Sequence, residues 1–193
     1  MPTGLHYSDS IAQQLLFEPI NEGANRLCIL TSHATPSMAS WLLKSYEEKG
    51  ITDVEVELII NDVIDEGIDA LSHEGFKELH GNRYSSIWSN FSCCYLCQPP
   101  ALKRNYYIWL DGENPVKAFC CSYEFTQQSI LRSRSGAMHS RVAAYAYGLY
   151  EKAVDHSIYC NHAEVDDYIV VRSSTAALST SSVSSEENCV NLS

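Results

Sequence analysis

The sequence predicts an α/β fold in which a mixed β-sheet is flanked by helices. Residues 25–60 follow a strand, helix, strand pattern, which is typical of a βαβ unit with two parallel strands. Two later apolar runs flank the turn residues DGENP, which indicates an antiparallel hairpin. An alanine-rich helical pattern follows at 139–156. Parallel and antiparallel pairs together predict a mixed sheet.

Local patterns justify the first three elements in chain order. The run at 25–32 is short, apolar and bounded by polar residues, so we expect a strand. A helix is expected at 35–50, with Pro36 in its first turn and Gly50 at its end. The run at 54–60 alternates and then becomes fully apolar, which predicts the second strand.

The remaining elements follow from similar signals. A helix is expected at 72–81, with Ser72 as its cap and Gly81 as its stop. Three further strands are predicted, at 92–98, 105–111 and 116–123. In the helix at 139–156, one apolar side is predicted to consist of Val142, Tyr145, Leu149 and Val154.

The length of 193 residues fits one domain with a sizeable core. We predict an N-terminal extension at 1–24, the domain itself at 25–171, and a Ser-rich, disordered tail at 172–193. No apolar run is long enough to span a bilayer, and the N-terminus has no signal-peptide pattern. The sequence therefore predicts a cytoplasmic protein without membrane contact.

The charge balance constrains the partners. The chain carries 13 Lys and Arg against 24 Asp and Glu, for a net charge of -11. Proteins that bind DNA nonspecifically normally have a basic face, so this activity is not expected. An acidic surface is compatible with a basic partner, such as a DNA-binding protein.

The eight cysteines are interpreted as reduced thiols rather than as a disulfide framework. Most lie in apolar, strand-like runs, where a thiol behaves as a small buried hydrophobe. A zinc site made of Cys94, Cys97, Cys120 and Cys121 was weighed. Neighbouring cysteines on a strand point to opposite faces, so Cys120 and Cys121 could not both face one ion. No metal and no cofactor is expected.

Several segments resemble the phospholipase D-like domain of NgoFVII-type restriction endonucleases. They are GFKELH, NPVKAF, FTQ and IYCNHAEVDDYI, and the likeness covers residues 25–171. The resemblance implies the phospholipase D fold and metal-independent phosphodiester hydrolysis through a phosphohistidine. It also implies a homodimer, because each chain of this family supplies one motif and two chains together complete one site.

The family motif can be placed on this sequence by its YIW segment. The nucleophilic His position is then occupied by Lys103, and the Lys position of the His-x-Lys pair by Asn105. The Gly-Ser corner reads Cys121-Ser122, and the Asn position holds Glu124. The resemblance thus predicts a scaffold in which most catalytic groups have been replaced.

These replacements argue against the family's reaction. A lysine ammonium has no lone pair with which to attack phosphorus unless its pKa is strongly lowered. The carboxylate of Glu124 would repel phosphate oxygens. We therefore predict a catalytically inactive protein that acts by binding. The candidate ligand-binding residues are Lys103, Asn105, Tyr107, Ser122, Glu124, Arg134, His139 and Arg141.

Three functions stay open on the sequence. In the first, a homodimeric phage or mobile-element protein counters defence in a bacterial host, by sequestering a nucleotide-like anion or by masking a host defence protein. In the second, the protein is an active metal-independent nuclease or phosphodiesterase that uses His139 or His33. In the third, it is a structural subunit whose corner is filled by side chains and binds nothing.

Overall fold

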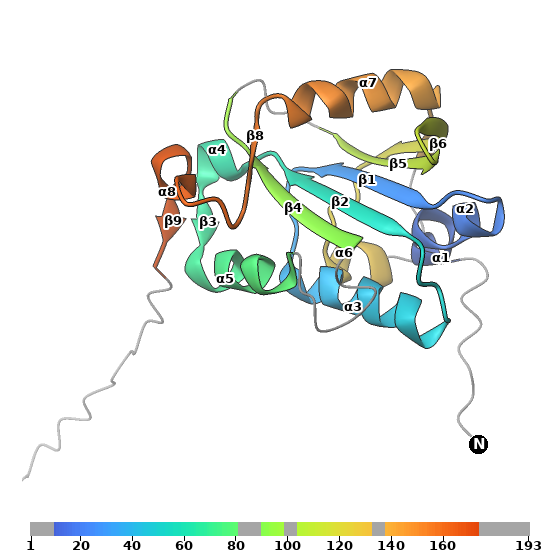
Figure 1. The fold of residues 1–193 in the computed structure, drawn as a ribbon, viewed down its shortest axis with the longest axis horizontal. Coiled ribbons are helices and arrows are strands. Elements are labelled where there is room, and N and C mark those ends of the chain that lie inside the picture. Colours follow the sequence, from blue (N-terminus) through green and yellow to red (C-terminus); the bar gives the residue numbers. More distant parts are fainter. Residues whose placement is uncertain (1–9, 81–89, 99–103, 133–137, 174–193) are drawn as a thin grey trace, which may run out of the picture.

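A computed structural model of the chain describes residues 10–80, 90–98, 104–132 and 138–173 (Figure 1). Its helices are α1 (Ile11–Leu16), α2 (Glu18–Asn21), α3 (Pro36–Glu48), α4 (Val63–Glu66), α5 (Ala70–Leu79), α6 (Gln127–Leu131), α7 (Ala143–Val154) and α8 (Val165–Tyr168). Its strands are β1 (Arg26–Thr31), β2 (Glu55–Ile60), β3 (Ile68–Asp69), β4 (Phe91–Leu96), β5 (Asn105–Asp111), β6 (Asn114–Cys121), β7 (Met138–Ser140), β8 (Ser157–Tyr159) and β9 (Val171–Arg172). The disordered tail is expected at 172–193. Of this segment, Arg172 belongs to β9, and residues from 174 onward lie outside the described residues.

Seven strands of the described residues form one sheet in the order β7-β6-β5-β1-β2-β4-β8. β1, β2 and β4 are parallel neighbours, and α3 connects β1 to β2. The other four strands each join the sheet in antiparallel orientation. The predicted βαβ unit, the β5–β6 hairpin and the mixed sheet are confirmed. β3 and β9 form a separate parallel pair.

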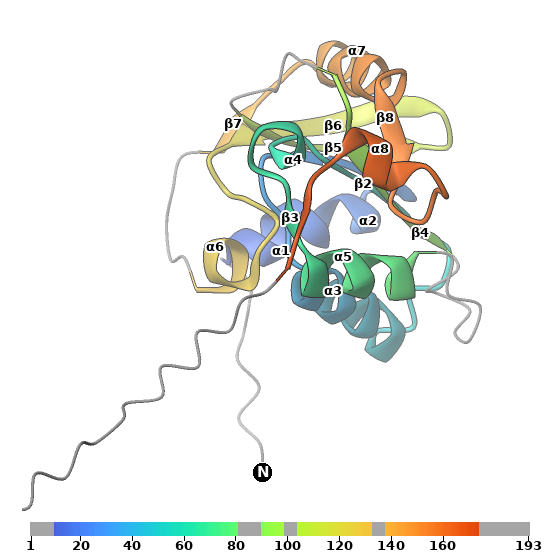
Figure 2. The same ribbon diagram turned by 90° about the vertical axis from the view of Figure 1, so that its left-hand side faces the viewer.

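The two faces of the sheet are covered by different helices. Leu27 and Ile29 of β1 belong to the larger core, which also takes buried residues of α1, α3 and α5. Cys28 and Leu30, which alternate with them, belong to a second core that includes residues of α7. Figures 1 and 2 show α3 and α5 on one side of the sheet and α7 on the other.

Helices α1 and α2 are part of this packing, although the sequence places residues 1–24 in an extension. Leu15 and Leu16 of α1 are fully buried in the larger core. The Leu15 carbonyl accepts a hydrogen bond from Trp109 Nε1 at 2.8 Å, and the Leu16 carbonyl accepts one from the Tyr46 hydroxyl at 2.8 Å. Burial of such leucines contributes about 1.5–3 kcal/mol each. The described part of the extension is thus packed against the sheet.

The helix predicted at 139–156 differs from its predicted form in two ways. α7 begins at Ala143, because residues 138–140 form β7, which pairs with β6. The buried side chains of α7 are Ala146, Tyr150 and Ala153. The predicted apolar side was wrong, since Val142, Tyr145 and Val154 are exposed. Small alanines let the helix approach the sheet closely, so they occupy the contact instead.

The start of α5 also differs from the prediction. The helix begins at Ala70, and its cap is Asp69 rather than Ser72. The Asp69 carboxylate accepts a hydrogen bond from the Ser72 backbone N–H at 2.9 Å, which satisfies a donor of the first turn.

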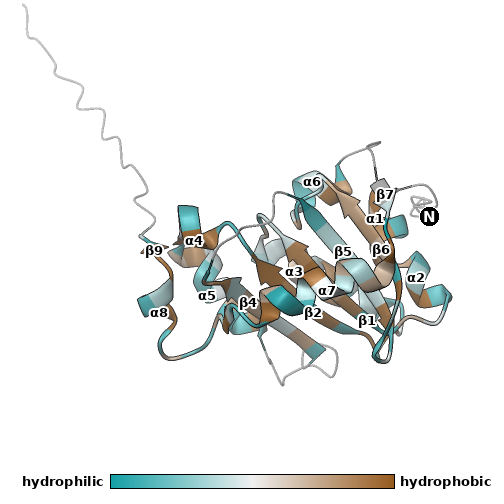
Figure 3. Cartoon of the chain, turned by 90° about the horizontal axis from the view of Figure 1, so that it is seen from above, coloured by the Kyte–Doolittle hydropathy of each residue, from teal (hydrophilic) through white to brown (hydrophobic). Residues whose placement is uncertain are grey.

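Figure 3, which looks down on α7, shows hydrophobic residues concentrated in the central strands. Within the described ranges, no helix is long and apolar enough to cross a membrane.

Candidate functional site

The described residues that the sequence aligns with the family motif, Asn105, Ser122 and Glu124, lie where three strands of the sheet end or begin. Asn105 is the first residue of β5, and it pairs with Cys121, the last residue of β6. β1 pairs with β5 and ends beside this point at Thr31. We call the region formed by residues 31–33, 105 and 121–124 the corner. The structure brings Asn105, Ser122 and Glu124 together there.

Asn105 holds the corner together through its side-chain oxygen. Its Oδ1 atom accepts a hydrogen bond from the Ser32 backbone N–H at 2.8 Å. The hydroxyl groups of Thr31 and Ser32 lie within hydrogen-bond distance of the same oxygen, at 3.0 and 3.2 Å. Asn105 is 4% exposed, so these contacts are largely protected from water. Asn105, which the sequence alignment predicts at the position of the family's lysine, therefore ties the end of β1 to β5.

Tyr107 supports the corner from within the core. Its side chain is fully buried, and its hydroxyl donates to the Tyr123 carbonyl at 3.0 Å. Ser122 is exposed and Glu124 is half-buried, so both can reach solvent from the same turn. A role for Tyr107 in direct ligand contact stays a prediction.

The basic candidates are less well placed by the structure. Lys103 and Arg134 lie outside the described residues. The backbone of His139 is in β7, opposite Cys120 and therefore next to the corner. Arg141 is exposed, and its backbone N–H donates to the Ala118 carbonyl at 3.0 Å, further along β6 from the corner.

Two loops at the corner are joined by backbone hydrogen bonds. The Phe125 N–H donates to the His33 carbonyl at 3.0 Å, and the Thr35 N–H donates to the Phe125 carbonyl at 3.1 Å. These bonds join the β1–α3 loop to the β6–α6 loop, with Ala34 and Phe125 forming a bridge. As a result, His33 and Glu124, which are far apart in the sequence, line one cleft.

This corner cleft has a volume of about 560 Å³. Its walls include the first turns of α3 and α6, whose caps are Thr35 and Thr126. Each threonine hydroxyl accepts a backbone N–H of its own helix, at 3.3 Å for Met38 and 3.1 Å for Ser129. The cleft is lined by His33, Thr35, Ser37, Glu124, Thr126, Gln127, Gln128 and Ser129.

The surroundings of the corner cleft are acidic. Asp62 lies near it, and its pKa is raised by burial first and then by the negative charges of Glu66, Asp65 and Glu124, while His33 opposes the shift. Among the described lining residues of the cleft, none is Lys or Arg. The described part of the corner therefore carries negative potential, which disfavours a phosphate group.

His33 was predicted from the sequence as a candidate, whereas Thr31, Ser32 and Asp62 were not. Thr31 and Ser32 come at the end of a predicted strand and carry hydroxyl groups. These two features could have indicated polar contacts at the corner. Their pairing with Asn105 spans 73 or 74 positions, so only the strand order reveals it. The sequence gives no comparable signal for Asp62.

The four cysteines weighed as a zinc set are not brought together. Cys94 lies in β4 and Cys97 just after it, whereas Cys120 and Cys121 lie in β6. Three strands separate β4 from β6 in the sheet. Within the described ranges, no group of three or more His, Cys, Asp or Glu side chains fits a metal ion.

Fold and corner together define an α/β domain of the phospholipase D type. The model of the NgoFVII restriction endonuclease N-terminal PLD domain matches residues 9–167, so the chain belongs to this family. The match begins before α1, in keeping with the burial of α1 in the larger core. A search of curated proteins found no match to the sequence.

Proposed function

We propose that this phospholipase D-like domain acts by binding and does not hydrolyse phosphodiesters. The observation that carries the proposal is the state of Asn105. Its side-chain oxygen, at the position aligned with the family's lysine, accepts hydrogen bonds from the end of β1 and is 4% exposed. This neutral amide lacks the positive charge with which the family's lysine stabilises the charge developing on a phosphoryl group.

The charge of the corner supports a cationic partner over a nucleotide-like anion. Glu124 aligns with a neutral asparagine of the family. The pKa of Asp62 is raised by burial first and then by Glu66, Asp65 and Glu124, so further carboxylates lie nearby. Two negative groups near one another favour a positive group between them. The proposed role is therefore to mask a basic defence protein in the cytoplasm of a bacterial host, as a phage or mobile-element protein would. Two chains are proposed to pair, as the family's shared site implies.

Binding can be tested with two probes of opposite charge. A fluorescent lysine-rich peptide is expected to bind, with an affinity that falls as salt rises, whereas a DNA oligonucleotide is not. The variant Asp62→Asn with Glu124→Gln is expected to weaken peptide binding by about fivefold. Glu47→Gln combined with Glu48→Gln, at two exposed positions at the end of α3, removes the same number of carboxylates and is the matched control. Binding of the oligonucleotide to the wild-type protein would contradict the proposal.

A second candidate function is favoured by the position of His33. This histidine and Glu124 line the same cleft, and a histidine beside a carboxylate is a combination used for nucleophilic catalysis. Hydrolysis of a model phosphodiester in the presence of a chelator decides between the two. We expect no turnover above buffer. Turnover that His33→Ala abolishes would establish the enzyme and remove the binding proposal.

A further inference from the structure

A second cleft lies on the face of the sheet that α7 covers, and it has a volume of about 350 Å³. That size is within the range of small-molecule sites. It is far along β1 from the corner, because Arg26 begins the strand and the corner lies at its end. The α7 cleft is lined by Arg26, Glu57, Ile59, Ser92, Cys94, Tyr147, Tyr150, Glu151, Val154, Asp155 and Tyr159.

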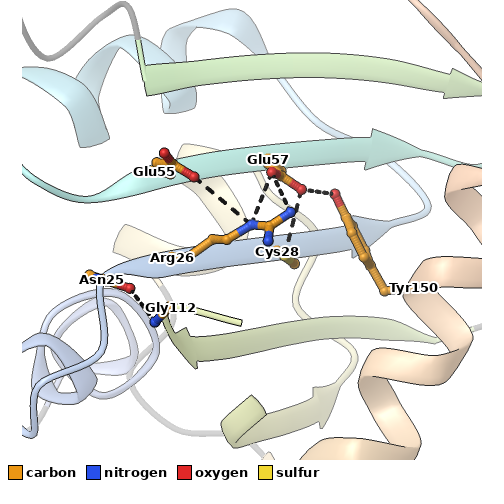
Figure 4. A network of polar contacts seen from close by, with 7 residues as sticks. All are labelled: Asn25, Arg26, Cys28, Glu55, Glu57, Gly112 and Tyr150. Atoms are coloured by element: carbon orange, nitrogen blue, oxygen red, sulfur yellow. Dashed lines mark hydrogen bonds and ion pairs between the residues drawn. The ribbon is translucent and has the colours of Figure 1, made fainter. Parts of the chain in front are cut away.

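The floor of the α7 cleft is a closed polar network (Figure 4). Glu57 Oε1 accepts hydrogen bonds from Arg26 Nε at 3.0 Å and from Arg26 Nη2 at 2.7 Å. Glu57 Oε2 accepts one from the Tyr150 hydroxyl at 2.8 Å and lies 3.8 Å from Cys28 Sγ. Each carboxylate oxygen is thus occupied, and the charge of Arg26 is neutralised by its neighbour. The floor is held in place by its own partners.

The walls and rim of the α7 cleft offer groups that the floor does not use. The Tyr147 ring is stacked against Tyr150, with centroids 6.2 Å apart and planes at 16°. Tyr159 of β8 is 53% exposed. Glu151 and Asp155 are exposed and four positions apart at the end of α7, so they lie on one side of it. In the described part of the chain, neither carboxylate forms an ion pair.

We propose that the α7 cleft binds a guanidinium or alkylammonium cation. Tyrosine rings attract such cations through their negative faces, and free carboxylates add charge attraction at the rim. The lining holds three carboxylates and one guanidinium, and that guanidinium is already paired with Glu57. An anion placed there would meet Glu151 and Asp155 without a free positive partner from the lining. The inference does not depend on the proposed function of the corner.

The cation could be a free small molecule or a basic side chain of a larger partner. Isothermal titration with N-acetyl-arginine amide, tetramethylammonium and an arginine-containing peptide separates these sources. Acetate and N-acetyl-glycine amide serve as anionic and neutral controls. Tighter binding of the peptide than of the free amide identifies a protein side chain as the ligand, and equal affinities identify the small cation. Both results support the site.

Two variants locate the binding on this face of the sheet. Glu151→Gln combined with Asp155→Asn changes exposed positions only, and it is expected to weaken cation binding by about fivefold. Tyr159→Leu, which keeps an apolar side chain on β8, is expected to weaken it by about threefold. Glu47→Gln combined with Glu48→Gln, on the opposite side of the sheet, also removes two exposed negative charges and is the matched control, so we expect no change.

Three results would overturn the proposal. One is equal binding of acetate and of the cations. Another is a loss in the Glu47 and Glu48 variant as large as in the Glu151 and Asp155 variant, which would indicate attraction to the overall negative charge. The last is absence of cation binding by wild-type protein at low salt. Because the corner variant Asp62→Asn with Glu124→Gln leaves the α7 cleft intact, unchanged cation binding in it separates this site from the corner.

Discussion

The corner and the α7 cleft lie at opposite ends of the same strand, β1. Their polar groups make different kinds of contact. At the corner, Asn105 and Thr31 make hydrogen bonds that hold loops and strand ends together. Under α7, Arg26 and Glu57 pair with each other across neighbouring strands and form a floor. The corner is where the sequence alignment predicts the family motif, with its reactive groups replaced. The α7 cleft has tyrosine rings and carboxylates without an ion pair among the described residues, and the predicted motif positions do not include them.

The largest expected effect tests the floor of the α7 cleft. Glu57→Ala leaves the Arg26 guanidinium, whose side chain is 25% exposed, without its nearest partner, and it removes the acceptor of the Tyr150 hydroxyl. We expect a loss of about 3 kcal/mol in the free energy of unfolding, measured by urea denaturation. The double variant Arg26→Met with Glu57→Leu should recover most of it. A loss no larger than for Glu22→Gln, which removes the exposed ion pair to Lys117, would show that the floor is not a stabilising unit.

A smaller effect is expected at the corner. Asn105→Ala removes the acceptor shared by Ser32 and Thr31, although the Thr31 hydroxyl can still donate to the His33 carbonyl at 3.0 Å. The expected loss is about 2 kcal/mol in the same denaturation experiment. Asn114→Ala, at an exposed asparagine of β6, serves as the control. If the two variants are equally stable, Asn105 does not hold the corner.

The part of the fold that the sequence predicts well depends on local signals. β1, α3 and β2 have bounded apolar runs, a proline in the first turn and a terminating glycine, and all three form as expected. The β5–β6 hairpin has turn residues between two strand patterns, and Gly112 adopts a φ of 59° in that turn. In each case the information lies within a few residues of the element itself.

The prediction for α7 failed because helical periodicity does not identify the buried side. Val142 and Tyr145 are large and apolar, yet Val142 is 73% and Tyr145 63% exposed. The sheet instead contacts Ala146 and Ala153, whose size permits close approach, and Tyr150, whose hydroxyl reaches Glu57. That choice depends on a half-buried carboxylate 93 positions away, which no local pattern contains.

The candidate sites were harder to predict for the same reason. The motif alignment indicated Asn105 and Glu124, and the chain does bring them to one corner. The partners of Asn105 come from β1, and the α7 cleft combines five elements of the chain. Only the strand order places these residues together. The position of the corner could therefore be predicted from the sequence. The hydrogen bonds within the corner and the presence of the α7 cleft could not.

Tyr150→Phe tests a single hydrogen bond of the floor of the α7 cleft, because it removes the hydroxyl and keeps the ring. The Glu57 carboxylate loses a donor at 2.8 Å but keeps both bonds from Arg26. We expect a loss of about 1 kcal/mol in the free energy of unfolding. Combined with Glu57→Ala, the two losses should not add, because both variants remove the same hydrogen bond. Additive losses would place the effect of Tyr150 in packing instead.

The smallest effect concerns the acidic surroundings of the corner and depends on pH. Asp62 has a pKa raised above its ordinary value by burial and by Glu66, Asp65 and Glu124. Between the unfolded pKa of about 3.9 and the higher folded pKa, the native state binds more protons than the unfolded state, so stability falls as pH rises through this window. Asp62→Asn should therefore stabilise the protein at neutral pH by less than about 1 kcal/mol, and this gain should vanish below about pH 4. Thermal unfolding across this pH range measures it, with exposed Asp53→Asn as the control. A gain that persists at low pH would mean that the substitution acts through packing, and the negative charge of the corner would then have no part in it.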